Sequence, residues 1–195
     1  MSNDREIRES LYKTDTVYLY LAIRRHKENK NIKGPEKIFR VVIRDEKEDL
    51  IGLMVKCKLF PGIWRIYKTV NPRNCKKAQI MLLHKLIDEP DKWCYRIDSL
   101  WKTMLLQPEC KMGKHFMVDV DLKEPELISK LVIEIIKSGG DILLTQESPN
   151  GFHLIVNKLD TRVINKEKYP NVDVIRDGYV FIDRIVVEEN KNEKK

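Results

Sequence analysis

The spacing of apolar residues predicts two halves that differ in secondary structure. In the first half strands and helices alternate, and Pro108 ends the last helix. The elements expected there are strands at 38–44 and 63–70 and helices at 45–57, 76–86 and 95–107. Residues 16–23 are rich in aromatic and β-branched side chains, so they fit either a strand or a helix capped by Asp15.

From residue 113 onward the chain is richer in strands. The expected elements are strands at 115–122, 141–146, 152–156, 172–176 and 179–187, a helix at 124–136, and a helix or loop at 160–168. A Gly-Gly pair ends the helix, and the dipeptides Asn150-Gly151 and Asp177-Gly178 each predict a hairpin. This order is typical of an RRM-like sheet, a split β-α-β arrangement with helices on one face.

The strand at 115–122 carries two acids. Alternation places Asp119 and Asp121 on one face and the valines and leucine around them on the other. Two neighbouring carboxylates repel each other, and burying them is unfavourable unless a cation joins them. A divalent metal bound between them, Mg²⁺ or Mn²⁺, is therefore expected.

The predicted fold class is α+β, with an N-terminal α/β unit packed on the RRM-like sheet that carries the acidic pair. We expect an N-terminal α/β subdomain at 1–112, an RRM-like, catalytic-type subdomain at 113–187 and a charged tail at 188–195. The links between the predicted elements are short, so no flexible interdomain linker is expected.

Composition narrows the classes of partner and compartment. The chain of 195 residues has a formal net charge of +7, which favours a polyanionic partner such as nucleic acid. No apolar run approaches the length of a membrane span, and the first residues contain no apolar signal core. We therefore expect a cytoplasmic protein with no membrane partner. The four cysteines form no CxxC pair and are expected to be reduced thiols.

A second motif follows the acidic pair after one helix and one strand. It reads Ser148-Pro149-Asn150-Gly151-Phe152-His153, a tight turn that leads into an apolar strand. Together with the Asp-x-Asp strand, it resembles the archaeo-eukaryotic primase superfamily, the primase-polymerases, in their small viral or plasmid form. The segment 65–72 is similar to a Tyr-x-Thr-x-Asn-Pro segment found in many members.

The resemblance implies a nucleotidyltransferase that joins nucleoside triphosphates on a DNA or RNA template during replication. It assigns Asp119 and Asp121 to catalysis and to the binding of Mg²⁺ or Mn²⁺. It assigns Ser148 and His153 to contacts with the incoming nucleotide, His153 also to catalysis. A helicase or another replisome component is a further expected partner, and a viral member would work in the host cytoplasm.

The family normally supplies a third metal-binding acid from another strand. Asp173 is preferred for this role because it begins a strand at the edge of the core. Asp177 and Asp183 are the alternatives, although the Asp-Gly context of Asp177 is also explained by a turn.

Positive side chains near the strand ends are candidates to neutralise phosphate charge. The predicted nucleotide- and phosphate-binding residues are Ser148, Asn150, Lys68, Arg65, Arg73 and Lys114. Ser148 is equally explained as a turn residue and Arg73 as a solvated charge. Two other functions fit the same residues, namely a catalytically degenerate primase-like nucleic-acid-binding protein in replication or repair, and a metal-dependent nuclease.

Overall fold

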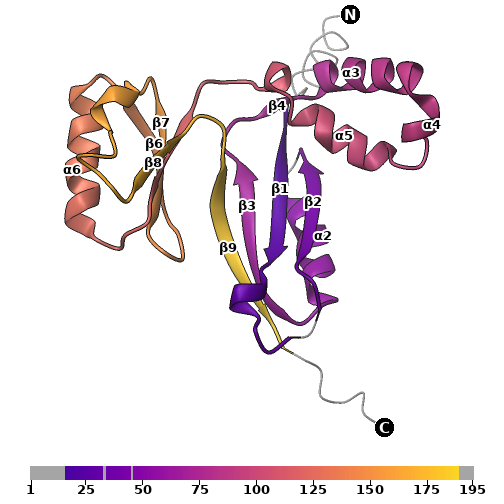
Figure 1. Ribbon diagram of the computed structural model, residues 1–195, viewed down its shortest axis with the longest axis horizontal. Helices are drawn as coiled ribbons and strands as arrows, with labels where there is room; N and C mark the ends of the chain where they lie inside the picture. The colour runs from indigo at the N-terminus through magenta and orange to yellow at the C-terminus, as the bar shows by residue number, and fades with distance from the viewer. Residues whose placement is uncertain (1–15, 33, 45, 189–195) are drawn as a thin grey trace, which may run out of the picture.

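A computed structural model describes residues 16–32, 34–44 and 46–188, and shows a mixed α+β fold (Figure 1). The strands are β1 (Thr16–Arg24), β2 (Lys37–Ile43), β3 (Gly62–Thr69), β4 (Arg73–Asn74), β5 (Phe116–Val120), β6 (Asp141–Glu147), β7 (Phe152–Asn157), β8 (Val172–Ile175) and β9 (Tyr179–Val187). The α-helices are α2 (Glu46–Lys58), α3 (Cys75–Asp88), α4 (Pro90–Trp93), α5 (Ile97–Leu105) and α6 (Pro125–Lys137). Short 3₁₀ helices are η1 (His26–Glu28), η2 (Pro108–Cys110) and η3 (Thr161–Val163). In this part of the chain, no helix is long and apolar enough to cross a membrane.

The first sheet has the strand order β2-β1-β3-β9, with β4 paired to β1, and every pairing is antiparallel. Residues 16–23 therefore form a strand, and the expected cap at Asp15 lies outside the described residues. Helix α2 packs on one face, where Trp64, Ile66 and Leu53 are fully buried. Residues 16–23, which the sequence left open between strand and helix, are a strand because β1 pairs on both sides, with β2 and with β3.

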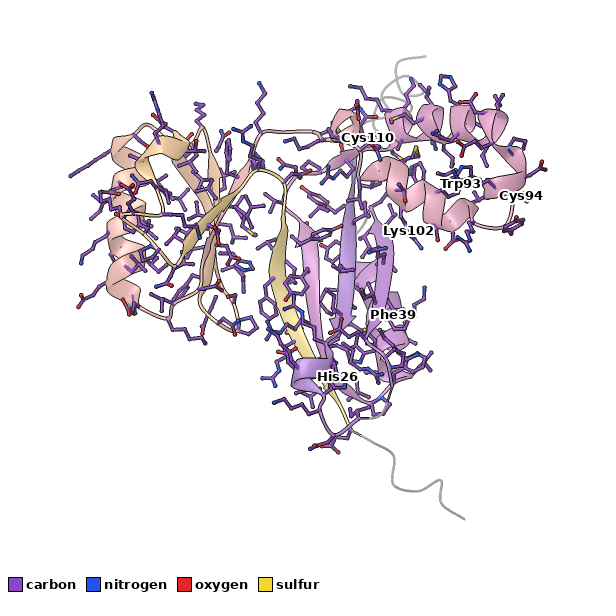
Figure 2. All side chains as sticks on the ribbon, in the orientation of Figure 1. His26, Phe39, Trp93, Cys94, Lys102 and Cys110 are labelled. Atoms are coloured by element: carbon purple, nitrogen blue, oxygen red, sulfur yellow. The ribbon has the colours of Figure 1, made fainter. Side chains whose placement is uncertain are left out.

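Helices α3, α4 and α5 form an arm that projects from the end of the first sheet, opposite the second sheet (Figure 1). Its root is a small core in which Val17 and Leu19 of β1 meet Ala78, Leu100 and Leu105. Figure 2 places Trp93 and Cys94 at the far end of this arm. All four cysteines are free thiols, and Cys94 is the exposed one. Burial raises the pKa of the Cys57 thiol to about 11, so this thiol stays protonated at neutral pH.

The second sheet has the order β6-β7-β5-β8 and is antiparallel throughout. Helix α6 covers one face, where Val118, Val120, Leu131, Ile135 and Leu154 are fully buried. The segment expected as a helix or loop at 160–168 contains only the turn of η3. The opposite face of this sheet is turned toward the first sheet, and a separate apolar cluster joins the two.

That cluster consists of Val70, Met117, Ile155 and Val180, which are contributed by both sheets. The expected hairpin of 172–176 with 179–187 is wrong, because β8 pairs with β5 whereas β9 pairs with β3. The chain therefore crosses from one sheet to the other between these strands. The predicted boundary after residue 112 separates the two sheets except for β9, which belongs to the first sheet.

A buried ion pair lies at this crossing. Arg73 is 1% exposed, and its Nη2 donates to both carboxylate oxygens of Asp177 at 2.8 Å. Asn71 is fully buried beside it and donates to Asp177 Oδ1 at 3.3 Å. The same Asn71 side chain accepts from the N–H of His115 and donates to the carbonyl of His115. One cluster thus ties the end of β3 to both connections between the sheets.

We expect Asp177→Ala to lower the free energy of unfolding by about 3 kcal/mol, because it leaves the buried Arg73 guanidinium without a counter-charge. Urea unfolding measures the effect. The matched control is Asp183→Ala, since Asp183 is an exposed acid on the neighbouring strand, and its loss should stay within about 0.5 kcal/mol. Equal small losses in both variants would show that the ion pair does not hold the crossing.

Candidate functional site

A cavity of about 390 Å³ lies between the two sheets. Six of the residues predicted from the sequence line it, five from the second sheet and its hairpin and one from the first sheet. These six are Asp119, Asp121, Ser148, Asn150, His153 and Arg65. The two sheets face each other (Figure 1), and residues that lie far apart in the sequence therefore line one cavity.

Strand β5 positions the acidic pair. Val118 and Val120 point into the core under α6, so alternation directs Asp119 to the opposite face, toward the cavity. Asp121 follows the last residue of β5, and its N–H donates to the carbonyl of Asn171 at 3.0 Å. Both carboxylates line the same cavity, as the alternation of the sequence predicts.

His153 lies directly opposite Asp119 in the register of β5 and β7. Its Nδ1 accepts a hydrogen bond from the backbone N–H of Phe181 at 3.0 Å. The proton of the neutral ring is therefore on Nε2, which lies 3.3 Å from Asp119 Oδ1. Because Phe181 belongs to β9, this 7% exposed histidine also links the second sheet to the first.

The turn between β6 and β7 closes over the end of β5. Ser148 and Gly151 exchange backbone hydrogen bonds, and Ser148 Oγ accepts from the Gly151 N–H at 3.1 Å. Gly151 does not have a positive φ. A Cβ at this position would instead lie 1.8 Å from the Val120 carbonyl oxygen. The Asn-Gly dipeptide thus serves close approach to β5, and Ser148 both forms the turn and lines the cavity.

Two arginines line the cavity together with the acids, Arg65 of β3 and Arg25 directly after β1. Arg65 Nε donates to Glu28 Oε1 at 2.6 Å. Burial opposes its charge, but hydrogen bonds to Glu28 and Tyr67 raise the pKa of the Arg65 guanidinium above its ordinary value. Arg25 also lines the cavity and lies over the Tyr67 ring at 5.8 Å. Among the described residues, Arg25 has no carboxylate partner.

Arg25 lines the cavity but is not among the residues selected from the sequence. The available signal was the period-2 run of Leu21, Ile23 and Arg25, which all line the cavity. The sequence analysis also missed the aromatic walls, which include Tyr67, Tyr179 and Phe181. Burial raises the pKa of the Tyr179 hydroxyl, which is therefore a neutral phenol at physiological pH.

Three predicted phosphate-binding cations lie elsewhere. Lys68 has its Nζ 4.0 Å from the centre of the Tyr18 ring and is not among the residues that line the cavity. Arg73 is the buried partner of Asp177. Lys114 lines a separate concavity beside Arg176.

The three candidates for the third acid have different surroundings. Asp173 lies directly opposite Asp119 in the register of β5 and β8, and its carboxylate pairs with Lys166 at 2.6 Å. Asp177 pairs with Arg73, and Asp183 is exposed opposite Ile66 on β3. Within the described residues, three or more His, Cys, Asp or Glu side chains are nowhere gathered as a metal site.

Comparison with known proteins gives no relative. No family model, curated protein or solved structure matches the chain.

We expect Gly151→Ala to lower the free energy of unfolding by at least about 3 kcal/mol, because its Cβ meets backbone atoms of β5 that have no room to move. The matched control is Gly52→Ala in α2, where a Cβ meets nothing within 4 Å. That change should stabilise the protein by up to about 1 kcal/mol through helix propensity. Thermal and urea unfolding of both variants measure the difference, and opposite signs are the expected result.

Proposed function

We propose that the protein is a template-dependent nucleotidyltransferase of the primase-polymerase type, which joins nucleoside triphosphates with the help of Mg²⁺ or Mn²⁺. The observation that carries this proposal is that Asp119, Asp121 and His153 all line the cavity between the sheets. Two arginines, Arg25 and Arg65, line the same cavity. A volume of about 390 Å³ falls in the range of small-molecule sites and suits a nucleotide.

The strand order supports the RRM-like assignment. Numbered along this half of the chain, β5, β6, β7 and β8 are strands one to four, and their order in the sheet is two-three-one-four. Every neighbouring pair is antiparallel and α6 crosses from the first strand to the second, which supports a split β-α-β arrangement. The turn of η3 takes the place of a second helix.

The donor set suits a metal that arrives with its substrate. Mg²⁺ is commonly held by one or two carboxylates together with substrate phosphates, and two carboxylates line this cavity. Asp119 and Asp121 would hold the metal. The chemistry that Mg²⁺ or Mn²⁺ supplies when bound is stabilisation of the charge on the attacking and leaving oxygens.

Residues of the chain account for the remaining requirements of the reaction. A primer 3′-hydroxyl attacks the α-phosphate, the bond to the β-phosphate breaks, pyrophosphate leaves and the hydroxyl proton is released to solvent. His153 presents Nε2–H to the cavity and can donate it to a phosphate oxygen in place of Asp119. Of the two arginines that line the cavity, Arg25 can neutralise triphosphate charge without breaking an ion pair among the described residues, since Arg65 is held by Glu28.

Asp173 is the third acid that the placement favours. Directly opposed residues of an antiparallel pair lie on the same face about 5 Å apart. Its present partner is Lys166, and both side chains are more than half exposed. Such an exposed pair contributes at most about 1 kcal/mol, so a rotation of Asp173 toward Asp119 has a low cost.

We expect Mn²⁺ and a non-hydrolysable nucleoside triphosphate to bind cooperatively, because each supplies ligands or charge that the other needs. Calorimetry should show Mn²⁺ affinity about 5- to 150-fold higher with nucleotide than without it. The Asp119→Asn/Asp121→Asn variant should lose this coupling. Equal Mn²⁺ affinity with and without nucleotide in the wild-type protein would remove the argument for a substrate-assembled metal site.

Primer extension tests the activity itself. Asp119→Asn and Asp121→Asn should each reduce nucleotide incorporation on a primed template by at least about 100-fold, because each removes charge that the transition state requires. Asp183→Asn, an equal change outside the cavity, should extend primers like the wild type. Retained incorporation in both cavity variants contradicts the proposal.

A second candidate function is a non-catalytic nucleic-acid-binding protein on the same fold. The observation that favours it is the pairing of Asp173 with Lys166, which leaves two carboxylates rather than three on the cavity wall. Template binding without metal-dependent incorporation by the wild-type protein distinguishes this function from the first.

A further inference from the structure

A second concavity, of about 510 Å³, lies where the two connections between the sheets meet the second sheet. It is lined by Lys111, Gly113, Lys114, Phe116 and Arg176, so all of its charged side chains are positive. We refer to it as the basic groove.

The basic groove and the candidate site lie on opposite faces of β5. Phe116 alternates in phase with Val118 and Val120, which point toward α6. Asp119 is out of phase with them and points into the cavity between the sheets. Phe116 and Asp119 are three residues apart on one strand, which corresponds to about 10 Å.

The cations of the basic groove have no counter-charge within the part of the chain that the structure describes. Among the described residues, none of Lys111, Lys114 and Arg176 has a carboxylate partner. Positive charges gathered around one concavity repel each other, and a bound polyanion relieves this repulsion. The half-buried Phe116 ring adds an apolar surface on which a planar base can stack.

The buried cluster at the crossing holds both segments that carry these cations. The backbone of Lys111 forms an isolated antiparallel β-bridge with the backbone of Arg73. The N–H of Met112 donates to the Pro72 carbonyl at 2.8 Å. Asn71 holds His115, the residue after Lys114, through two hydrogen bonds. On the other segment, Arg176 is followed directly by Asp177, the partner of Arg73. The backbone that carries these cations is thus held in place by contacts within the protein.

We propose that the basic groove binds the phosphate backbone of single-stranded nucleic acid. The inference rests on the proposed function, since the bound strand would be the template that continues from the cavity around the edge of the second sheet. Three cations beside an aromatic ring match a strand that offers regularly spaced phosphates and planar bases. An acidic peptide offers the charges but not the bases.

The test is fluorescence anisotropy of a labelled oligo-dT with full-length protein across a salt series, without metal or nucleotide. Each phosphate contact contributes about 0.7 to the slope of log affinity against log salt for single strands. The triple variant Lys111→Gln/Lys114→Gln/Arg176→Gln should therefore lower the slope by about 2. The matched control Lys30→Gln/Lys56→Gln/Lys58→Gln removes the same charge from exposed positions on the first sheet's loop and α2, and should keep the wild-type slope. Equal slopes in the two triple variants overturn the proposal.

Two further measurements separate the ligand classes. Phe116→Leu should weaken oligo-dT binding by about 5-fold or more with an unchanged salt slope, because stacking does not release counterions. Polyglutamate of matched charge should compete poorly. Displacement of oligo-dT by polyglutamate at equal charge concentration would overturn the assignment to nucleic acid and indicate an acidic protein partner instead.

The failure of this inference can be distinguished from failure of the proposed function. If the groove variant binds normally while the wild type extends primers, only the groove inference fails. If the groove variant loses binding while the wild type never extends primers, only the proposed activity fails.

Discussion

The ion pair between Arg73 and Asp177 is the constraint on which the relation of the two sheets depends. Two other nitrogens of Arg73, Nε and Nη1, are buried without a protein hydrogen-bond partner. Burying a guanidinium whose nitrogens lack hydrogen-bond partners lowers the stability of the fold. A well-packed apolar pair at the same place can be equally or more stable. We infer that the pair is kept for the geometry it imposes on the crossing. Gly178, the next residue after Asp177, accepts from the Val70 N–H and lines the cavity, so this geometry reaches the candidate site directly.

His153 provides a second link, closer to the acids. It receives the N–H of Phe181 from the first sheet and contacts Asp119 within the second sheet. Between this link and the ion pair lies the apolar cluster around Met117 and Val180. A buried apolar cluster alone tolerates sliding, whereas two directional polar contacts at its sides fix the angle between the sheets. The acids therefore face a wall whose distance is set by the fold.

Features that depend only on neighbouring residues, such as the face of a strand and the position of a turn, could be predicted from the sequence. The alternation around Asp119 correctly placed the acids on the face away from α6, and the hairpin before His153 was correctly located. The Asp177-Gly178 dipeptide was misinterpreted because a turn signal does not contain the partner that decides the direction of the chain. That partner, Arg73, lies 104 residues earlier. Lys68 was misplaced for a related reason, since its ring partner Tyr18 lies on a strand whose identity the sequence left open.

The contact between His153 and Asp119 would have to break for a metal and a nucleotide to bind in the cavity. In the protein alone, the Nε2–H of His153 is directed at an oxygen that a metal would also require. Binding of a metal and a triphosphate would exchange this contact for two stronger ones, carboxylate to metal and imidazole to phosphate. Neither ligand alone completes the exchange, because the metal leaves the histidine proton without an acceptor and the triphosphate leaves the acids repelling its charge. In the proposed site the two ligands would therefore favour each other, and Arg25, which lines the same cavity, would add a charge that acts on the nucleotide alone.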